Sequence, residues 1–303
     1  MNPSLRGYFA IANTPFSESG DIIWTDLERE WDFIARSGSH GLVWPVNDSE
    51  FSLLSNRERV EGFRRAVQVV GKRIPVVLGV ADTNAPGAAD YAEAAAKAGA
   101  DLVIAMPPWH TKLATRPQYI AYYRAIADAC GLPICIQNVF PPMGSDLSAD
   151  TVAAICDSVP LVQCIKEERL PQGDALSNIM ERQIPQLKAI FGGGWCFSMI
   201  AHHKRGAAGN MASSAVPEVH AQVWNLMEAG REDEERKIQA VLNELMRTET
   251  SVQTLHGVKQ SLVLRGIFTS AAMRNIAPRV IDAPYLRELE WALALLQPYL
   301  KPV

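Results

Sequence analysis

Eight short apolar runs, separated by segments with helical patterning, constrain the fold of this chain more than any other feature. The runs cover residues 8–13, 41–46, 75–80, 102–106, 133–139, 162–165, 187–191 and 207–212. Several lack alternating polar residues, which is typical of parallel strands buried on both faces. They recur every ~20–33 residues, a length that suits a strand followed by a helix. This order favours a closed (β/α)₈ barrel.

A doubly wound open sheet is the alternative fold. Such a sheet would be expected to carry a glycine-rich dinucleotide fingerprint after its first strand. Here the first run leads instead into Asn13–Phe16, which contains no glycine. The barrel is therefore the fold that we expect.

Helix signals lie between the runs and continue after them. Thr25 with Glu28 has the spacing of a capping box and predicts a helix over 25–38. Beyond about residue 216 the sequence predicts amphipathic helices over 219–229, 232–247, 252–265 and 284–300. We therefore expect a TIM barrel over residues 1–228 and a C-terminal helical extension, packed on the barrel, over residues 229–303.

Charge and hydropathy exclude several classes of partner. The net charge is −4, and no stripe of Lys and Arg interleaved with aromatic residues suggests nucleic acid binding. No apolar run approaches the ~20 residues that span a bilayer. The first eight residues lack the apolar core of a signal peptide, and the five cysteines form no Cys-x-x-Cys pair. We expect a cytoplasmic protein that binds neither nucleic acid nor membrane.

Lys166 is the most informative candidate for the active site. In a (β/α)₈ barrel the site lies at the C-terminal ends of the strands, and Lys166 follows the apolar run 162–165. At its ordinary pKa a lysine is only ~0.04% neutral at pH 7, but burial lowers that pKa and frees the amine to attack a ketone. The alternative is a structural ion pair with Glu167, Glu168 or Asp48.

Motifs at the ends of these runs resemble the dihydrodipicolinate synthase and N-acetylneuraminate lyase superfamily over essentially the whole chain. They are Asn13–Phe16, Asn47–Glu50, Ala105–Pro108, Asn138–Val139, Ile165–Glu167 and Gly209–Ser213. The resemblance implies that Lys166 forms a Schiff base with a small-molecule 2-oxo acid. It also implies a homo-oligomer that assembles as a dimer of dimers, and no cofactor.

Departures from the superfamily pattern narrow the expected reaction. Asn47–Glu50 replaces a Gly-x-x-Gly-Glu turn, and Gln137 stands where the family has its proton-relay tyrosine. An amide cannot serve as an acid or base near neutral pH. The turn, the run Ala105–His110, Gln137 and the Lys-x-Glu at 166–168 are similar to the 2-keto-3-deoxy-L-arabonate dehydratase branch. This similarity implies dehydration of a 2-keto-3-deoxy sugar acid.

We predict a catalytic group of Lys166, Glu168 and Gln137. Glu168, His110 and a bound water are the candidates for the general acid. The predicted substrate-binding residues are Asn47, Ser49, Glu50, Trp109, His110, Gly193 and Ser213. The alternatives are that Asn47 and Ser49 only shape a turn, that Glu168 is a solvated loop carboxylate, and that the aromatic residues pack in the core or an interface. No His, Asp and Glu cluster has metal-ligand spacing, so we expect no metal.

Two other functions stay open at this point. A pyruvate-dependent aldolase or hydratase-aldolase would use the same lysine but break the C3–C4 bond. A ligand-binding or regulatory barrel without catalysis would explain the missing tyrosine.

Overall fold

The computed structural model describes residues 5–109, 115–141, 143–213, 215–274 and 281–303. The chain divides into two units. The first holds residues 1–6, 56–68 and 75–211, and the second holds residues 7–55, 69–74 and 212–303. The division differs from the barrel and extension predicted over 1–228 and 229–303, and that boundary stays a prediction.

Within the described residues, eight parallel strands form a closed barrel in chain order, which confirms the predicted fold class. They are β1 (Gly7–Ile11), β2 (Gly41–Trp44), β3 (Val76–Gly79), β4 (Leu102–Ala105), β5 (Ile134–Asn138), β6 (Val162–Glu167), β7 (Ala189–Gly192) and β8 (Gly209–Ser213). Each strand end lies within two residues of its predicted position. The predictions are accurate because nearly every strand residue is buried, so the strands read as continuous apolar runs.

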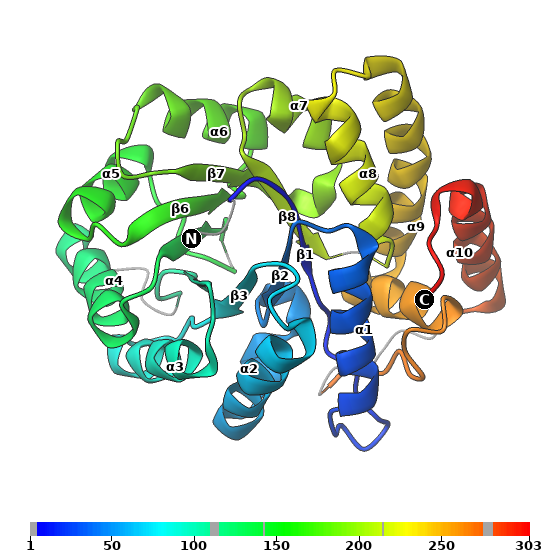
Figure 1. Cartoon of the computed structure of the whole chain (residues 1–303), viewed down its shortest axis with the longest axis horizontal. Helices are drawn as coiled ribbons and strands as arrows, with labels where there is room; N and C mark the ends of the chain where they lie inside the picture. The colour runs from blue at the N-terminus through cyan, green and yellow to red at the C-terminus, as the bar shows by residue number, and fades with distance from the viewer. Residues whose placement is uncertain (1–4, 110–114, 142, 214, 275–280) are drawn as a thin grey trace. The chain divides into compact units, whose positions relative to one another are not determined.

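The helices follow the strands as expected. They are α1 (Trp24–Ser37), α2 (Asn56–Val70), α3 (Ala85–Ala98), α4 (Arg116–Cys130), α5 (Ala149–Ser158), α6 (Gln172–Glu181), α7 (Met199–Lys204), α8 (Pro217–Glu228), α9 (Glu232–Leu264) and α10 (Ala283–Leu296). Short 3₁₀ turns cover Asn47–Ser49, Phe51–Leu53, Gly194–Cys196 and Gln297–Tyr299. In the first unit, β6 and β7 lie inside the arc of helices α3 to α6 (Figure 1).

The predicted capping box at Thr25 is wrong. Helix α1 begins at Trp24, its N-cap is Ile23, and no side chain caps it. Asp26, in the first turn, is buried and accepts hydrogen bonds from the backbone N–H and the hydroxyl of Thr269, each at 2.6 Å. The first turn is therefore fixed by a tertiary contact rather than by a side-chain cap.

Helix α9 replaces the two helices predicted over 232–247 and 252–265, and it bends sharply. A Cβ atom built on Gly257 would lie 2.2 Å from the backbone oxygen of Glu249. Eight residues of straight helix would separate these positions by about 12 Å. The bend explains why the sequence pattern read as two helices.

The register of the strands around β6 fixes which side chains share a face. Gln137 on β5 pairs with Lys166 on β6, and Asn138 pairs with Glu167. Paired residues on parallel strands point to the same side of the sheet, and successive residues point to opposite sides. Lys166 and Gln137 therefore share one side, and Glu167 and Asn138 share the other.

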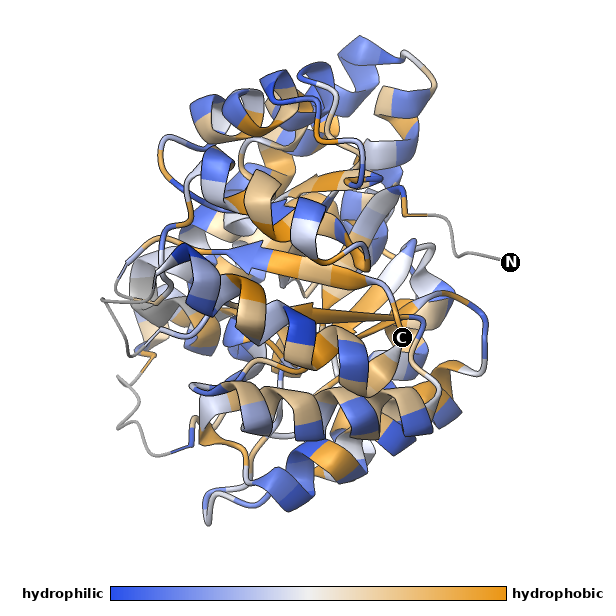
Figure 2. Cartoon of the chain, turned by 90° about the vertical axis from the view of Figure 1, so that its left-hand side faces the viewer, coloured by the Kyte–Doolittle hydropathy of each residue, from blue (hydrophilic) through white to orange (hydrophobic). Residues whose placement is uncertain are grey.

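The hydropathy of the residues differs between the strands and the helices. Figure 2 shows strands coloured mainly as hydrophobic and helices with hydrophilic outward faces. No helix in the described part of the chain is both long enough and apolar enough to cross a membrane.

Candidate active site

Lys166 is buried at the C-terminal end of β6, and it pairs with a carboxylate of its own segment. The residue is 2% exposed, and its Nζ lies 2.9 Å from Oε1 of Glu168. This is one of the ion pairs that the sequence offered as the alternative to catalysis. The two interpretations are compatible, because a carboxylate beside an ammonium group can also accept its proton.

Glu168 is held by contacts on both of its oxygens. Oε2 accepts a hydrogen bond from Nε2 of Gln137 at 3.1 Å, while Oε1 faces Lys166. The backbone N–H of Gly194 lies 3.5 Å from Oε1. A Cβ atom on Gly193 would lie 2.5 Å from the same oxygen, so the glycine leaves the space that the carboxylate fills. The three residues predicted to be catalytic therefore lie together, with Gly193 beside them.

Glu167 forms a separate buried contact on the other side of β6. Its carboxylate accepts hydrogen bonds from Nδ2 of Asn138 at 2.9 Å and from the backbone N–H of Arg169 at 2.8 Å. Burial raises the pKa of Glu167 to about 7, although both hydrogen bonds act to lower it. Because Glu167 and Arg169 flank Glu168 in sequence, and Asn138 pairs with Glu167 across the sheet, this contact supports the backbone that carries Glu168. The backbone N–H of Glu168 itself donates to the carbonyl of Asn138 at 3.0 Å.

In the second unit, the turn Asn47–Glu50 after β2 is hydrogen-bonded to the end of β1. The Ser49 hydroxyl donates to the carbonyl of Ala12 at 2.5 Å, and the Thr14 hydroxyl donates to the carbonyl of Ser49 at 2.6 Å. Nδ2 of Asn13 donates to the carbonyl of Asp48 at 3.0 Å. Three residues after β1 thus fix the conformation of this turn.

Asn13 also connects two buried side chains of the second unit. Its Oδ1 accepts a hydrogen bond from the Ser213 hydroxyl at 2.7 Å, and its backbone N–H lies 3.1 Å from both oxygens of Glu30. Burial raises the pKa of Glu30 well above its usual value. Through Asn13, Ser213 at the end of β8 belongs to the same network as the turn.

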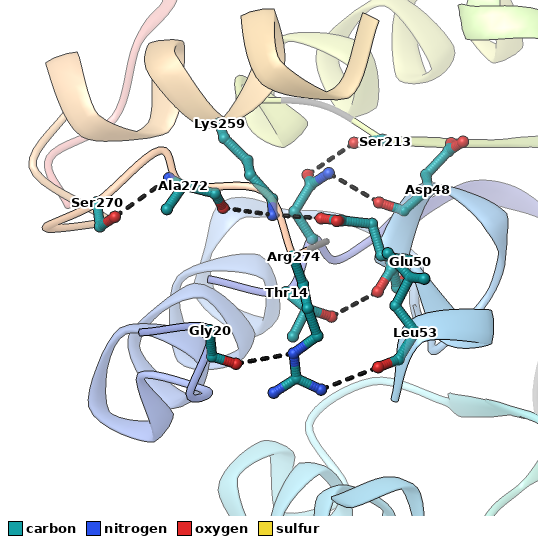
Figure 3. A network of polar contacts seen from close by, with 12 residues as sticks. Thr14, Gly20, Asp48, Glu50, Leu53, Ser213, Lys259, Ser270, Ala272 and Arg274 are labelled. Carbon is teal, nitrogen blue, oxygen red and sulfur yellow. Dashed lines mark hydrogen bonds and ion pairs between the residues drawn. The ribbon is translucent and has the colours of Figure 1, made fainter. Parts of the chain in front are cut away.

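Glu50 ends the turn in an ion pair with Lys259 of α9 (Figure 3). Both side chains are buried, and Nζ of Lys259 also donates to the carbonyl of Ala272 at 3.1 Å. Burial raises the pKa of Glu50 and lowers the pKa of Lys259, and the attraction between the two charges opposes both changes. The carboxylate predicted to bind substrate is therefore paired inside the protein.

The structure places the remaining predicted residues as follows. Asn47 is half-buried in the turn beside Ser49, and Trp109 is half-buried after β4. His110 lies outside the described residues. The substrate-binding roles of these residues stay predictions.

Sequence reasoning missed Lys259 as a site-related residue, although a signal was present. Lys259 lies four residues after Leu255 and three before Leu262, on the apolar stripe of an amphipathic helix. A lysine on such a stripe is rarely buried without a partner.

The group around Lys166 has the components for proton transfer at an imine. It offers an amine, a carboxylate in contact with that amine, and an amide that holds the carboxylate by donating a hydrogen bond. Within the described ranges, no group of three or more His, Cys, Asp and Glu side chains is placed to hold a metal ion.

Comparison with known proteins agrees with this geometry. The sequence profile of the Dihydrodipicolinate synthetase family matches residues 4–280. The L-2-keto-3-deoxyarabonate dehydratase of Azospirillum brasilense is 26% identical over 234 residues, 77% of this chain and 75% of that protein. The 4-hydroxy-tetrahydrodipicolinate synthase of Marinobacter nauticus is 28% identical over 251 residues, 80% of this chain and 82% of that protein.

A solved structure shows the same fold. YagE, a prophage protein of the dihydrodipicolinic acid synthase family from E. coli K12, superimposes with a TM-score of 0.85. The match covers 97% of this chain and 98% of that one, at 23% identity. Together with the profile match over most of the sequence, these findings show that the chain belongs to the dihydrodipicolinate synthetase family of lyases.

Proposed function

We propose that this protein is a Schiff-base lyase that removes water from a 2-keto-3-deoxy sugar acid, with Lys166 as the amine. The observation that supports this most directly is the buried amine at the end of β6, in contact with Glu168. The name of the Azospirillum relative supports the dehydratase reaction.

The first stage joins substrate and enzyme. Glu168 takes a proton from the Lys166 ammonium, and the neutral amine attacks the C2 ketone. The carbinolamine then loses water and becomes an iminium ion. The positive nitrogen draws electrons from C2 and acidifies the hydrogens on C3.

The second stage removes the hydroxyl group. A base takes a proton from C3 and gives an enamine, whose electrons expel the C4 hydroxyl as the iminium re-forms. The expelled hydroxyl leaves as water once an acid protonates it. Glu168 contacts the amine and can carry a proton in both steps, while Gln137 orients it. Hydrolysis of the resulting C3=C4 unsaturated iminium restores the Lys166 amine and releases an unsaturated 2-oxo acid. Where C5 carries a terminal hydroxyl, tautomerisation moves one hydrogen of C5 and that of the hydroxyl to C3 and C4 and gives the 2-oxo acid semialdehyde.

Further parts of the proposal concern substrate binding and assembly. We assign the C1 carboxylate to Asn47, the half-buried side chain of the turn, because the turn follows a barrel strand at its C-terminal end. The Ser49 hydroxyl donates its one proton to the carbonyl of Ala12, so we assign it to support of the turn. We also propose a cytoplasmic homotetramer, which sedimentation of the purified protein and fractionation of cells would test.

The decisive experiment is reductive trapping. The protein is incubated with pyruvate or with 2-keto-3-deoxy acids and then reduced with borohydride. After digestion, mass spectrometry gives the mass of the peptide that contains Lys166. We expect this peptide to gain the mass of the reduced adduct, and we expect Lys166→Ala to lose both the adduct and turnover. Lys97→Ala is the control, because that side chain is 70% exposed on α3.

Product analysis then separates the alternatives. A 2-oxo acid semialdehyde supports the dehydratase, whereas release of pyruvate supports an aldolase or hydratase-aldolase. A wild-type protein that forms no adduct with any 2-oxo acid would support a ligand-binding barrel without catalysis.

A further inference from the structure

The conformation of the turn Asn47–Glu50 depends on contacts from two sides. On one side, Ala12, Asn13 and Thr14 bind its carbonyl groups and the Ser49 hydroxyl. On the other side, the contact is ionic and comes from helix α9, more than two hundred residues later in the chain. Figure 3 shows Lys259 extending from α9 to the carboxylate of Glu50.

Glu50 adopts a backbone conformation that residues other than glycine seldom adopt. Its φ is 56° and its ψ is 37°, in the left-handed region. The residue joins two 3₁₀ turns, since its N–H donates to Asn47 and its carbonyl accepts from Leu53, each at 2.9 Å. A residue in this region needs surrounding contacts that hold it there. The ion pair with Lys259 is such a contact.

The cation of Lys259 is itself fixed by neighbours from two further segments, at Phe16 and at residues 272–274. Nζ of Lys259 donates to the carbonyl of Ala272 and lies 4.6 Å from the centre of the Phe16 ring. The guanidinium group of Arg274 lies 4.4 Å from the same ring and donates to the carbonyls of Gly20 and Leu53, at 2.8 and 2.9 Å. Lys259 is thus a fixed point against which Glu50 is placed.

We propose that Lys259 is a positioning residue for substrate binding, which acts through Glu50 to hold the turn that carries Asn47 in its binding conformation. The inference rests on the proposed function, because it takes Asn47 to bind the substrate carboxylate. A buried ion pair adds little net stability compared with apolar residues of similar size, so stability alone is a weak reason for this one. The ion pair between Lys259 and Glu50 does fix the conformation of the turn Asn47–Glu50.

Two variants separate positioning from stability. Lys259→Met leaves Glu50 buried without its cation, so both the melting temperature and substrate affinity should fall. The double variant Lys259→Met with Glu50→Met replaces the pair with apolar side chains, so the melting temperature should recover. In both variants we expect KM for the 2-oxo acid to rise about tenfold or more, with kcat within about threefold of wild type.

The control removes a comparable pair elsewhere in the same unit. Arg265 and Glu218 form a buried ion pair at 2.7 Å, with side chains 5% and 1% exposed. Arg265→Met with Glu218→Met should leave KM within about twofold of wild type. Borohydride trapping of Lys166 at saturating substrate should proceed in every folded variant.

The outcomes distinguish the inference from the proposed function. If KM returns to the wild-type value in the Lys259 and Glu50 double variant, or rises equally in the control, the positioning role is wrong. If wild-type protein forms no borohydride adduct, the proposed function fails and the positioning role fails with it. A wild-type adduct with an unchanged KM in Lys259→Met overturns the positioning role alone.

Discussion

Oε1 of Glu168 lies 2.9 Å from Nζ of Lys166, and the other oxygen of the same carboxylate accepts a hydrogen bond from Gln137. Each oxygen has its own partner, so the carboxylate cannot rotate without breaking a contact. The arrangement points one oxygen at the amine and leaves the orientation of the group to a side chain that does not titrate. The following predictions depend on this and on three other features of the fold.

Glu168→Gln should lower kcat by about 10²–10⁴-fold, because an amide neither accepts the Lys166 proton nor returns one to a leaving hydroxyl. Steady-state kinetics with the 2-oxo acid substrate check this. Glu181→Gln, at the exposed end of α6, is the control. A kcat within about twofold of wild type would remove Glu168 from the mechanism.

Gly193→Ala should lower kcat about tenfold or more with little change in stability. The added Cβ would lie 2.5 Å from Oε1 of Glu168, and the flexible carboxylate would move away from Lys166. Gly173→Ala is a matched control, since the atoms nearest its Cβ would belong to the flexible guanidinium group of Arg205, at 2.9 Å and beyond. Equal activity of the two variants would show that the space at Gly193 has no catalytic importance.

Gly257→Ala should destabilise the protein by about 1–3 kcal/mol, because its Cβ would overlap the backbone of Glu249 at the bend of α9. Urea unfolding measures the difference in the free energy of unfolding. Lys237→Ala, exposed on the same helix, is the control. Wild-type stability in the Gly257 variant would mean that α9 does not bend there.

Glu249→Gln should change stability in a pH-dependent way. The side chain is 3% exposed, and burial raises its pKa from 4.5 to about 7. A raised pKa means that the folded state prefers the protonated carboxyl, so the stability that Glu249 contributes is complete below pH 4.5 and is lost as the pH rises to 7. The difference of about 2.5 pKa units corresponds to about 3 kcal/mol.

Glutamine does not titrate, so the wild-type protein alone loses stability as the pH rises through this window. The free energy of unfolding of the variant should therefore rise relative to that of the wild-type protein by up to that amount. Unfolding curves across the window check the prediction. Glu290→Gln, at an exposed position of α10, is the control. A pH-independent difference between Glu249→Gln and the wild-type protein would mean that the Glu249 carboxyl is solvated.

The barrel could be predicted from the sequence because parallel strands that are buried on both faces appear as continuous apolar runs. Runs such as Leu102–Ala105 and Ile134–Ile136 are apolar throughout, and helices α3 and α4 end at Gly99 and Gly131, which adopt positive φ. Local patterns predicted the structure less well where contacts between residues far apart in the sequence determine the conformation. The cap expected at Thr25 is absent, and the first turn of α1 is instead tied to Thr269 through Asp26, a contact that no short motif encodes.

The candidate site was predicted in part for the same reason. Lys166, Glu168 and Gln137 follow apolar runs, and their register brings them together as strand geometry requires. The pairing of Glu50 with Lys259 spans 209 positions of sequence, and no local motif links the two residues.

Side chains alternate between the two faces of β6, so the residue that faces Gln137 depends on the register of the strand. Lys166 and Glu167 are neighbours in sequence but face opposite sides of the same strand, one toward Gln137 and the other toward Asn138. Removing one residue between Val162 and Ile165 would exchange them, so the carboxylate with the raised pKa would take the place of the amine. The strand could keep its hydrogen bonds through such a slip, and the proposed nucleophile would leave the site although every side chain of the site is still present.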